Sequence, residues 1–305
     1  MKFRELSYVV TVADCLSITK AAQKLYISQP SLSHTISKIE EEMGAKLFDR
    51  TSYPIRLTYA GERYVETARQ ILRLADNLKR EFTDISNGAT GRVVIGMPTE
   101  RMGYMLPRIF PAFKKEFPGI EIRTIEGKYE MLLEAVLTGE ANFVIVPLWH
   151  NVEETTSELT SELIYKEELI FVADPSMVPE EARIAGRTDC VDLSKLQDIP
   201  YVLVRKGHAV RTTTDSLFRS AHISPKKIME TDSTLTAFNL AMSGAAAALV
   251  PRRTVEMANP LNQFQCYHIG EDGCYWNVAA IYRKDAYLDH AARRFIEIAK
   301  ERFTQ

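Results

Sequence analysis

Short hydrogen-bonding side chains gather in one segment near the N-terminus. The segment comprises Ser28, Gln29, Pro30, Ser31, Ser33, His34, Ser37 and Lys38. A glutamine amide can pair with adenine through two hydrogen bonds, and small hydroxyl residues let a backbone approach phosphates. The segment therefore predicts a surface that contacts DNA. The alternative is the solvated face of an ordinary helix, although such faces usually favour Glu, Lys and Arg over Ser and Thr.

Two short helices are predicted to position these side chains. Ser17 is a suitable N-cap for the first helix, and Ser28 for the second, which should run from 29 to 43 and stop at Gly44. Pro30 is tolerated in the first turn because its missing N–H would lack an intrahelical partner there. Two short helices joined by a tight turn are typical of a helix-turn-helix, whose second helix enters the major groove.

Basic residues follow the second helix. Residues 47–58 form two short extended runs around a turn, which predicts a wing beside the helices. Arg50, Thr51 and Arg56 lie in this segment, and arginines suit contacts with phosphates or with the minor groove. The alternative is that these are ordinary surface side chains.

The balance of charge permits DNA binding without requiring it. The 305 residues carry a formal net charge of −2. Residues 1–58 contain eight Lys and Arg against six Asp and Glu, a local charge of +2, which leaves −4 for the remainder. The N-terminal segment is thus mildly basic, which is the sign that a DNA contact needs.

A long helix is predicted to start after Thr58. Its apolar side chains are spaced alternately by four and three residues, which is the pattern of a coiled-coil seam. The seam consists of Tyr64, Ala68, Ile71, Ala75, Leu78 and Phe82. A helix this long with so narrow an apolar stripe favours pairing with a second copy of the chain. The alternative is packing against its own domain.

The N-terminal residues together resemble a known family. The run comprises Leu6, Ala13, Ser17, Ala21, Ala22, Leu25, Ser28, Gln29, Pro30, Leu32, Ser33, Ile36, Glu40, Gly44, Leu47, Phe48, Arg50, Leu57, Thr58 and Gly61. It is similar to the N-terminal domain of LysR-type transcriptional regulators. Val10, Leu16 and His34 differ from residues that are common in the family, and His34 leaves the preferred DNA sequence open.

The resemblance implies an organisation for the whole chain. A winged helix-turn-helix domain would occupy 1–58, a linker and dimerisation helix with a hinge 59–91, and an effector-binding domain 92–305. The implied partners are double-stranded DNA, a small-molecule effector, further copies in a dimer or tetramer, and RNA polymerase. An effector between two lobes would change how the DNA is bent, through its different affinities for two arrangements of the protein.

Strands and helices alternate after residue 92. Strands at 93–96, 120–125 and 141–146, with helices at 103–117 and 129–138, favour a parallel sheet. Further strands are predicted at 169–173, 201–204, 228–231, 245–250 and 275–282, and further helices near 211–221, 234–243 and 287–302. The order resembles the two-lobed α/β architecture of periplasmic binding proteins, with lobe one at 92–164 and 268–305 and lobe two at 165–267.

Polar residues follow several of these strands. Ligands in α/β proteins bind beyond the carboxyl ends of strands, and helix N-termini offer free N–H groups to anions. The candidate effector contacts are Thr99, Glu100, Arg101, Thr124, Glu126, Pro147, Arg205, His208 and Ser233. The adjacent cations Arg205 and Lys206 hint at an anionic effector. The alternative is that these residues are helix caps and solvated charges.

Several classes of function find no support in the sequence. It contains no G-x-S-x-G, no glycine-rich phosphate loop and no H-E-x-x-H, so no enzymatic activity is expected. The four cysteines include no C-x-x-C pair, so neither zinc nor another cofactor is predicted. No apolar run approaches the roughly 18–20 residues that span a bilayer, and the N-terminus lacks the pattern of a signal peptide, which indicates a cytoplasmic protein without a membrane partner.

Two alternative functions remain open at this point. Cys266 and Cys274 are eight residues apart and could form a reversible disulfide, which would make the protein a redox-sensing regulator. The C-terminal part could also be a solute-binding α/β protein with an unrelated helical appendage.

Overall fold

The computed structural model describes residues 2–51, 54–86, 90–148, 156–258 and 266–304. The chain forms two compact units, residues 1–86 and residues 87–305. In the described ranges, no helix combines the length and the apolar character that crossing a membrane would require.

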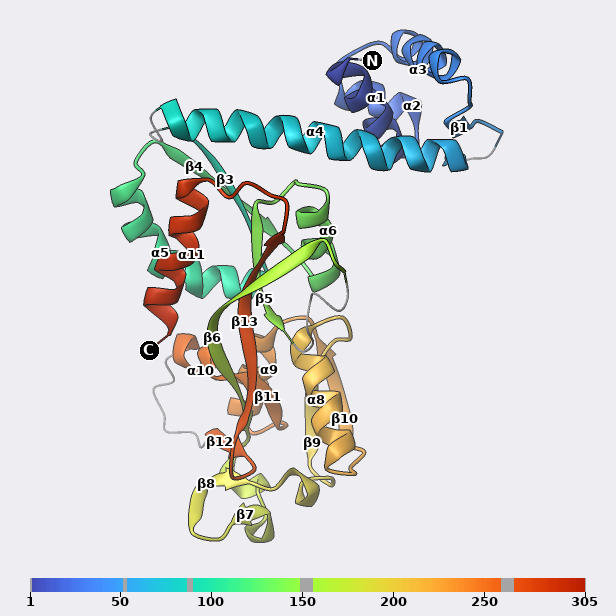
Figure 1. The fold of residues 1–305 in the computed structure, drawn as a ribbon. Coiled ribbons are helices and arrows are strands. Elements are labelled where there is room, and N and C mark those ends of the chain that lie inside the picture. Colours follow the sequence, from blue (N-terminus) through green and yellow to red (C-terminus); the bar gives the residue numbers. More distant parts are fainter. Residues whose placement is uncertain (1, 52–53, 87–89, 149–155, 259–265, 305) are drawn as a thin grey trace. The chain divides into compact units, whose positions relative to one another are not determined.

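The first unit is helical with a small two-stranded wing (Figure 1). Its elements are α1 (Phe3–Cys15), α2 (Ile18–Lys24), α3 (Gln29–Met43), β1 (Phe48–Asp49), β2 (Arg56–Leu57) and α4 (Tyr59–Ser86). The predicted caps are present, since Ser17 Oγ accepts from the N–H of Lys20 and Ser28 Oγ from that of Ser31. Gly44 ends α3 with a φ of +68°, a conformation that glycine adopts without steric cost. The wing residues 52–53 lie outside the described ranges.

Small side chains let the first three helices approach closely. Ala21 and Ala22 of α2 are buried together with Val12 of α1 and Ile36 of α3. The carboxylate of Glu40, also buried, accepts hydrogen bonds from the backbone N–H groups of residues 47 and 48, at 2.9 and 3.2 Å. A charge inside the core thereby fixes the start of the wing against α3.

One glycine allows α4 to begin against the wing. A Cβ atom at Gly61 would lie 1.9 Å from the carbonyl oxygen of Leu47, so no larger residue fits there. Thr58 caps the helix through a 3.0 Å hydrogen bond from the N–H of Gly61. Farther along α4, Val65 and Ala68 are buried, and α1 packs against this helix.

The second unit is built on a mixed sheet. Its first strands are β3 (Gly91–Met97), β4 (Ile120–Glu126) and β5 (Phe143–Leu148), connected by α5 (Thr99–Glu116) and α6 (Tyr129–Leu137). These three strands are parallel, as predicted. The sheet continues through β13 (Cys274–Arg283) and β6 (Leu159–Val172), which pair antiparallel with each other, and β13 is also antiparallel to β5. The parallel arrangement predicted for the first three strands is therefore confirmed, and antiparallel strands extend the sheet beyond β5.

Helices cover both faces of this part of the sheet. Alternate residues of β5 belong to different cores, with Phe143 and Ile145 on the side of α5 and α11 (His290–Phe303) and Val144 and Val146 on the side of α6. Successive side chains of a strand point to opposite faces, so the uninterrupted apolar run of β5 is explained. Figure 1 shows α5 and α11 together on one side of the strands. We call β3, β4, β5, α5, α6 and α11, together with the adjoining parts of β6 and β13, the proximal half.

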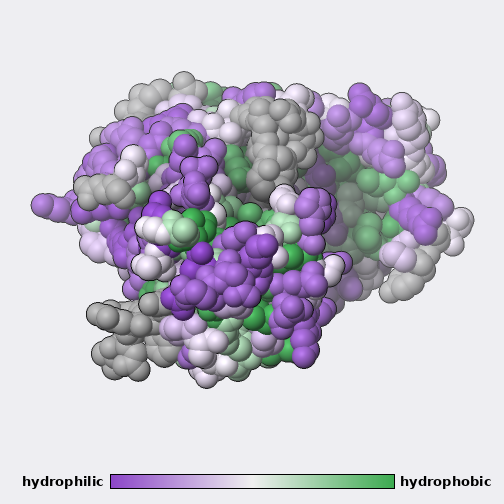
Figure 2. All heavy atoms as spheres, turned by 90° about the horizontal axis from the view of Figure 1, so that it is seen from below, coloured by the Kyte–Doolittle hydropathy of each residue, from purple (hydrophilic) through white to green (hydrophobic). Residues whose placement is uncertain are grey.

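The remaining elements form a distal half. They are β7 (Arg183–Ile184), β8 (Arg187–Val191), β9 (Pro200–Val204), α8 (Ala209–Ser220), β10 (Lys226–Thr231), α9 (Thr234–Met242), β11 (Ala248–Pro251), α10 (Arg252–Ala258) and β12 (Cys266–Ile269). Strands β9 and β10 are parallel, whereas β11 pairs antiparallel with the end of β6. Figure 2 shows one face of the molecule, on which hydrophilic side chains predominate and hydrophobic ones lie mainly in the recesses between them.

Three expected element boundaries were wrong. Helix α5 begins at Thr99 and not at 103, because the polar residues of its first turn have partners elsewhere in the fold. Strand β5 continues through Pro147, which is opposite Val278 of β13. Strand β6 begins ten residues earlier than 169, at Leu159, and the proposed lobe boundary at 164/165 falls within it. The short elements β7, β8, β12 and α10 were not predicted.

Candidate functional site

The predicted DNA-contacting side chains lie along α3 and the wing. Those that are exposed are Ser28, Gln29, Pro30, Ser31, His34, Lys38, Arg50, Thr51 and Arg56, whereas Ser33 and Ser37 are half-buried. The opposite side of α3 carries the buried Leu32, Ile36 and Ile39. The helix therefore presents a polar face of short side chains from its N-terminal half, as the sequence predicted.

Two wing residues are tied to their neighbours. The guanidinium of Arg50 lies 3.3 Å from both the carboxylate of Glu40 and the hydroxyl of Ser37. The hydroxyl of Thr51 donates to Asp49 at 2.6 Å. Arg50 thus lies beside α3, with its charge partly balanced by the buried carboxylate, while Arg56 of β2 extends from the exposed edge of the wing.

The predicted seam of α4 has two different parts. Tyr64 and Ala68 contribute to or pack near the core of the first unit, whereas Leu78 and Phe82 are 55% and 62% exposed. Leu74, one turn before Leu78, is 62% exposed as well. Since large apolar side chains in a row are uncommon on a solvated helix, this part of α4 has the character of an interface.

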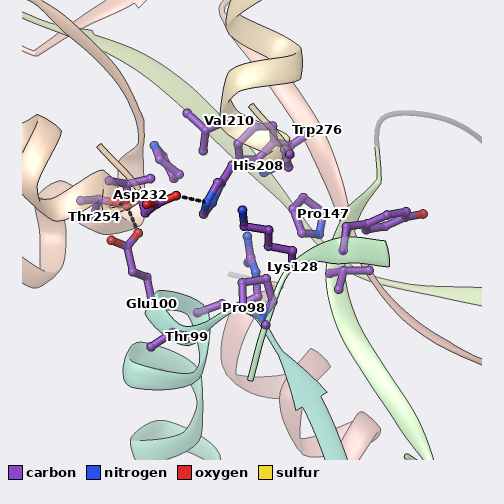
Figure 3. Close-up of a pocket in the computed structure, with 18 of the residues that line it drawn as sticks. Pro98, Thr99, Glu100, Lys128, Pro147, His208, Val210, Asp232, Thr254 and Trp276 are labelled. Atoms are coloured by element: carbon purple, nitrogen blue, oxygen red, sulfur yellow. Dashed lines mark hydrogen bonds and ion pairs between the residues drawn. The ribbon is translucent and has the colours of Figure 1, made fainter. Parts of the chain in front are cut away.

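A cavity of about 320 Å³ lies between the two halves of the second unit (Figure 3). Its lining comprises Pro98, Thr99, Glu100, Arg101, Tyr104, Gly127, Lys128, Tyr129, Val146, Pro147, Gly207, His208, Ala209, Val210, Asp232, Thr234, Pro251, Thr254 and Trp276. Most of the proximal residues follow β3 and β4 or lie at the end of β5, and most of the distal ones surround the starts of α8 and α9. This volume suits a small organic molecule.

Five of the nine predicted effector contacts line the cavity. These are Thr99, Glu100, Arg101, Pro147 and His208. Ser233 reaches the site through its hydrogen bond to Glu100. Thr124 and Glu126 belong to β4 itself and are exposed, and Arg205 is paired with Asp232 at 2.5 Å. The prediction omitted Lys128, which lies two positions after the end of β4. A predicted end of this strand slightly later in the sequence would have placed Lys128 among the candidates.

The floor of the cavity contains a buried ion pair. The Arg101 guanidinium donates to Glu167 of β6 at 2.7 Å, and to the hydroxyls of Tyr104 and Tyr165 at 2.5 Å each. The indole N–H of Trp276 also donates to Glu167, at 3.1 Å. Burial alone would lower the pKa of Arg101, but the nearby Glu167 carboxylate and the two phenols raise it well above its ordinary value. Arg101 is thus a permanent cation whose charge is already balanced.

The distal wall carries its own charge pairs. His208 Nε2 lies 3.4 Å from Asp232 Oδ1, while the other oxygen of Asp232 accepts from Arg205. The ammonium of Lys128 points toward His208 in Figure 3. Among the described residues, no acidic group lies within 4 Å of this ammonium. Within the described ranges, Lys128 thus has no ion-pair partner among the residues that line the cavity.

Apolar surface surrounds these charges. Pro98, Val146 and Pro147 line the cavity on the proximal side, and Val210 and Pro251 on the distal side. Tyr129 is buried, and burial raises the pKa of its phenol to about 12, so this side chain is neutral at physiological pH. In the described ranges, no cluster of three or more His, Cys, Asp or Glu could bind a metal ion. The cavity thus combines apolar lining residues with a few charged and polar side chains.

Comparisons with known proteins agree with both units. Residues 3–62 match the model of the bacterial regulatory helix-turn-helix proteins of the lysR family. Residues 86–304 match the LysR substrate binding domain. The chain belongs to the LysR family of transcriptional regulators. It is a DNA-binding transcriptional regulator with a C-terminal effector-binding domain, and the alternative of a solute-binding protein with an unrelated helical appendage is wrong.

Individual relatives cover nearly the whole of this LysR-family chain. The HTH-type transcriptional regulator YwbI of Bacillus subtilis is 30% identical over 98% of this chain and 96% of that protein. The hydrogen peroxide-inducible genes activator of Escherichia coli is 29% identical over 84% of this chain and 80% of that protein. The structure of a full-length OxyR variant from Pseudomonas aeruginosa is similar in fold, with a TM-score of 0.71 and 22% identity over 99% of this chain and 94% of that one.

Proposed function

We propose that this regulator responds to a small organic anion with an apolar body, bound in the cavity between the two halves. The observation that carries the proposal is the ammonium of Lys128, which faces a cavity whose lining includes three prolines, two valines, two tyrosines and one tryptophan. The two carboxylates of the lining already have partners. Asp232 pairs with Arg205 and His208, and Glu100 accepts hydrogen bonds from two hydroxyls and a backbone N–H. A ligand anion would therefore be attracted to Lys128 and His208.

Thermal unfolding of the full chain with a panel of carboxylates and their neutral amides tests this proposal. A carboxylate at one hundred times its Kd should stabilise the folded state by about 2.7 kcal/mol, while its amide should not. Lys128→Met should weaken binding of that carboxylate by about tenfold, the loss of a single partly exposed charge contact. Lys115→Met, a substitution at an exposed lysine of α5 outside the cavity, is the control. Equal binding of the amide would refute the anionic class.

The DNA-binding half of the function is assigned to the exposed face of α3 and to the wing. The side chains proposed to contact double-stranded DNA are those of residues 28–38 together with Arg50, Thr51 and Arg56. The seam at Leu78 and Phe82 supports a homodimer or a tetramer through α4. The divisions at 1–58, 59–91 and 92–305 remain predictions, and linker residues 87–89 lie outside the described ranges.

Three further parts of the proposal come from the family alone. RNA polymerase is the expected protein partner of a regulator of this kind. The cytoplasm, where DNA is found in a bacterium, is the expected location. The chain is expected to act by binding and not as an enzyme.

The alternative of a redox-sensing regulator, in which Cys266 and Cys274 form a reversible disulfide, has less support. Cys266 is opposite Val172 of β6, and Cys274 is opposite Leu169. Three strand positions correspond to about 10 Å, which exceeds the roughly 7 Å between Cα atoms that a disulfide can bridge. Burial also raises the pKa of both thiols, which disfavours the reactive thiolate. The described arrangement of these cysteines therefore favours the small-molecule effector.

A further inference from the structure

The carboxylate of Glu100 crosses from one half of the second unit to the other. Glu100 lies in the first turn of α5, which packs against β4 and α11 of the proximal half. Its Oε1 accepts from Ser233 Oγ at 2.7 Å and from the backbone N–H of Leu235 at 3.2 Å, and its Oε2 accepts from Thr234 Oγ1. All three donors belong to the start of α9, which packs against β9, β11 and α10 of the distal half.

This arrangement is that of a bound anion. The first N–H groups of a helix lack intrahelical partners and carry partial positive charge, so a helix start attracts carboxylates. Here two hydroxyls add to the N–H of Leu235, and Thr234 is itself buried and bonded to Thr254 at 3.2 Å. Figure 3 shows Glu100 on the wall of the cavity, directed toward Thr254. The anion-binding end of α9 is thus occupied by a side chain of the protein.

We propose that Glu100 is a built-in ligand of the α9 N-terminus and holds the two halves of the second unit together in the absence of effector. The proposal rests on the assignment of the cavity as the effector site. Since Glu100 already occupies this helix end, an anionic effector is directed to the other side of the cavity, toward Lys128 and His208. Glu100 is then the residue that selects where the charge of the effector lies.

Removal of Glu100 and addition of acetate test the proposal. In the full-length Glu100→Ala chain, the α9 N-terminus would be vacant, and acetate is a free copy of the missing carboxylate. The melting temperature would be compared in sodium acetate and in sodium chloride of equal ionic strength, for the wild type and for Glu100→Ala. The control is Glu126→Ala, which removes an exposed carboxylate at the end of β4. Intrinsic tryptophan fluorescence, to which Trp276 of the cavity lining contributes together with Trp149, gives a second readout.

The expected result is a specific rescue. Glu100→Ala should melt lower than the wild type by about 4–8 °C, and acetate should recover a large part of this loss. Wild type and Glu126→Ala should show no difference between the two salts. If acetate shifts all three proteins equally, or if Glu100→Ala melts like the wild type, the built-in ligand is refuted.

Two additional variants separate this result from misfolding and from failure of the proposed function. Thr234→Val keeps the carboxylate and removes one of its donors, so it should lower the melting temperature less than Glu100→Ala and should gain nothing from acetate. Glu100→Gln should fall between wild type and Glu100→Ala. If a carboxylate effector binds the wild type but acetate does not rescue Glu100→Ala, the built-in ligand is refuted and the proposed function stands. If acetate rescues Glu100→Ala but no carboxylate of the panel binds, only the proposed class of effector is refuted.

Discussion

Nη2 of Arg101 lies 2.7 Å from Oε2 of Glu167, and the two side chains are 6% and 1% exposed. One residue comes from the first turn of α5 and the other from the middle of β6, so the ion pair joins a helix to the strand that runs through both halves. Tyr104, Tyr165 and Trp276 satisfy further donors and acceptors of the pair. The floor of the cavity is consequently a buried polar network within an apolar core, in which the Nε of Arg101 has no hydrogen-bond partner among the described residues.

Breaking this ion pair on one side should be costly. Arg101→Met leaves the Glu167 carboxylate buried without its cation, and we expect the free energy of unfolding to fall by about 3–5 kcal/mol. The double variant Arg101→Met/Glu167→Leu, which removes both charges, should recover much of this loss. Urea denaturation of the wild type, Arg101→Met, Glu167→Leu and the double variant measures both effects. If the free energy of unfolding falls in the double variant by the sum of the losses in the two single variants, the interpretation is contradicted.

The network also predicts a loss of stability at high pH. Burial raises the pKa of Tyr165 from 10.0 to about 12. The Tyr165 phenol therefore loses its proton at a lower pH in the unfolded chain than in the folded one. Its contribution to stability is complete below pH 10 and is lost between about pH 10 and 12. Over this window the contribution of one such group falls by about 2–3 kcal/mol. Tyr165→Phe should therefore show a shallower decline than the wild type, whereas Tyr275→Phe, at an exposed site, should not.

Specific DNA binding should depend on Gln29. Loss of a bidentate contact with a base costs about 1–3 kcal/mol in discrimination, so Gln29→Ala should weaken binding to the operator far more than binding to random DNA. Ser33→Ala should act in the same direction and more weakly. Gln70→Ala, at an exposed glutamine of α4, is the matched control. Equal losses for operator and random DNA would show that Gln29 positions the helix without reading a base.

Arg56 should contribute to affinity without contributing to specificity. If its guanidinium contacts a phosphate, Arg56→Gln should reduce the slope of log K against log salt by about 1. The reduction should be the same for operator and random DNA, because phosphates carry no sequence information. Titrations at several salt concentrations measure the slope, and Arg123→Gln, on β4 of the second unit, is the control. An unchanged slope would remove Arg56 from the phosphate contacts.

The exposed part of the α4 seam should control assembly. Leu78→Glu and Phe82→Glu place charges among side chains that we propose to be buried between two copies, so each should shift the chain toward monomer. Asp76→Lys changes the charge on another face of α4 and should leave the assembly intact. Sedimentation velocity at several protein concentrations measures the mass. Unchanged assembly in Leu78→Glu and Phe82→Glu would place the interface elsewhere.

The first unit was almost entirely predictable from sequence, because its signals are local. The caps Ser17, Ser28 and Gly44 lie next to the ends that they determine, and α3 has the predicted bounds. The cavity was only partly predictable. Arg101 seemed to belong to a loop because its partner Glu167 is 66 positions away in the chain, and no local pattern indicates such a pairing. Thr124 and Lys128 differ by four positions, a distance comparable to the uncertainty of a predicted strand end.

Strands β6 and β13 bracket the distal half, and this has a consequence for synthesis on the ribosome. The sheet that starts at β3 is completed only by β13 and α11, the last elements of the chain. Residues 1–86 form a compact unit with a core of their own, whereas the proximal half must wait until the entire distal half has been made. A nascent chain would therefore carry a finished DNA-binding domain while its sensor is still unfinished. Premature termination before α11 would remove the helix that packs against α5 and β6 and would leave the core of the proximal half incomplete.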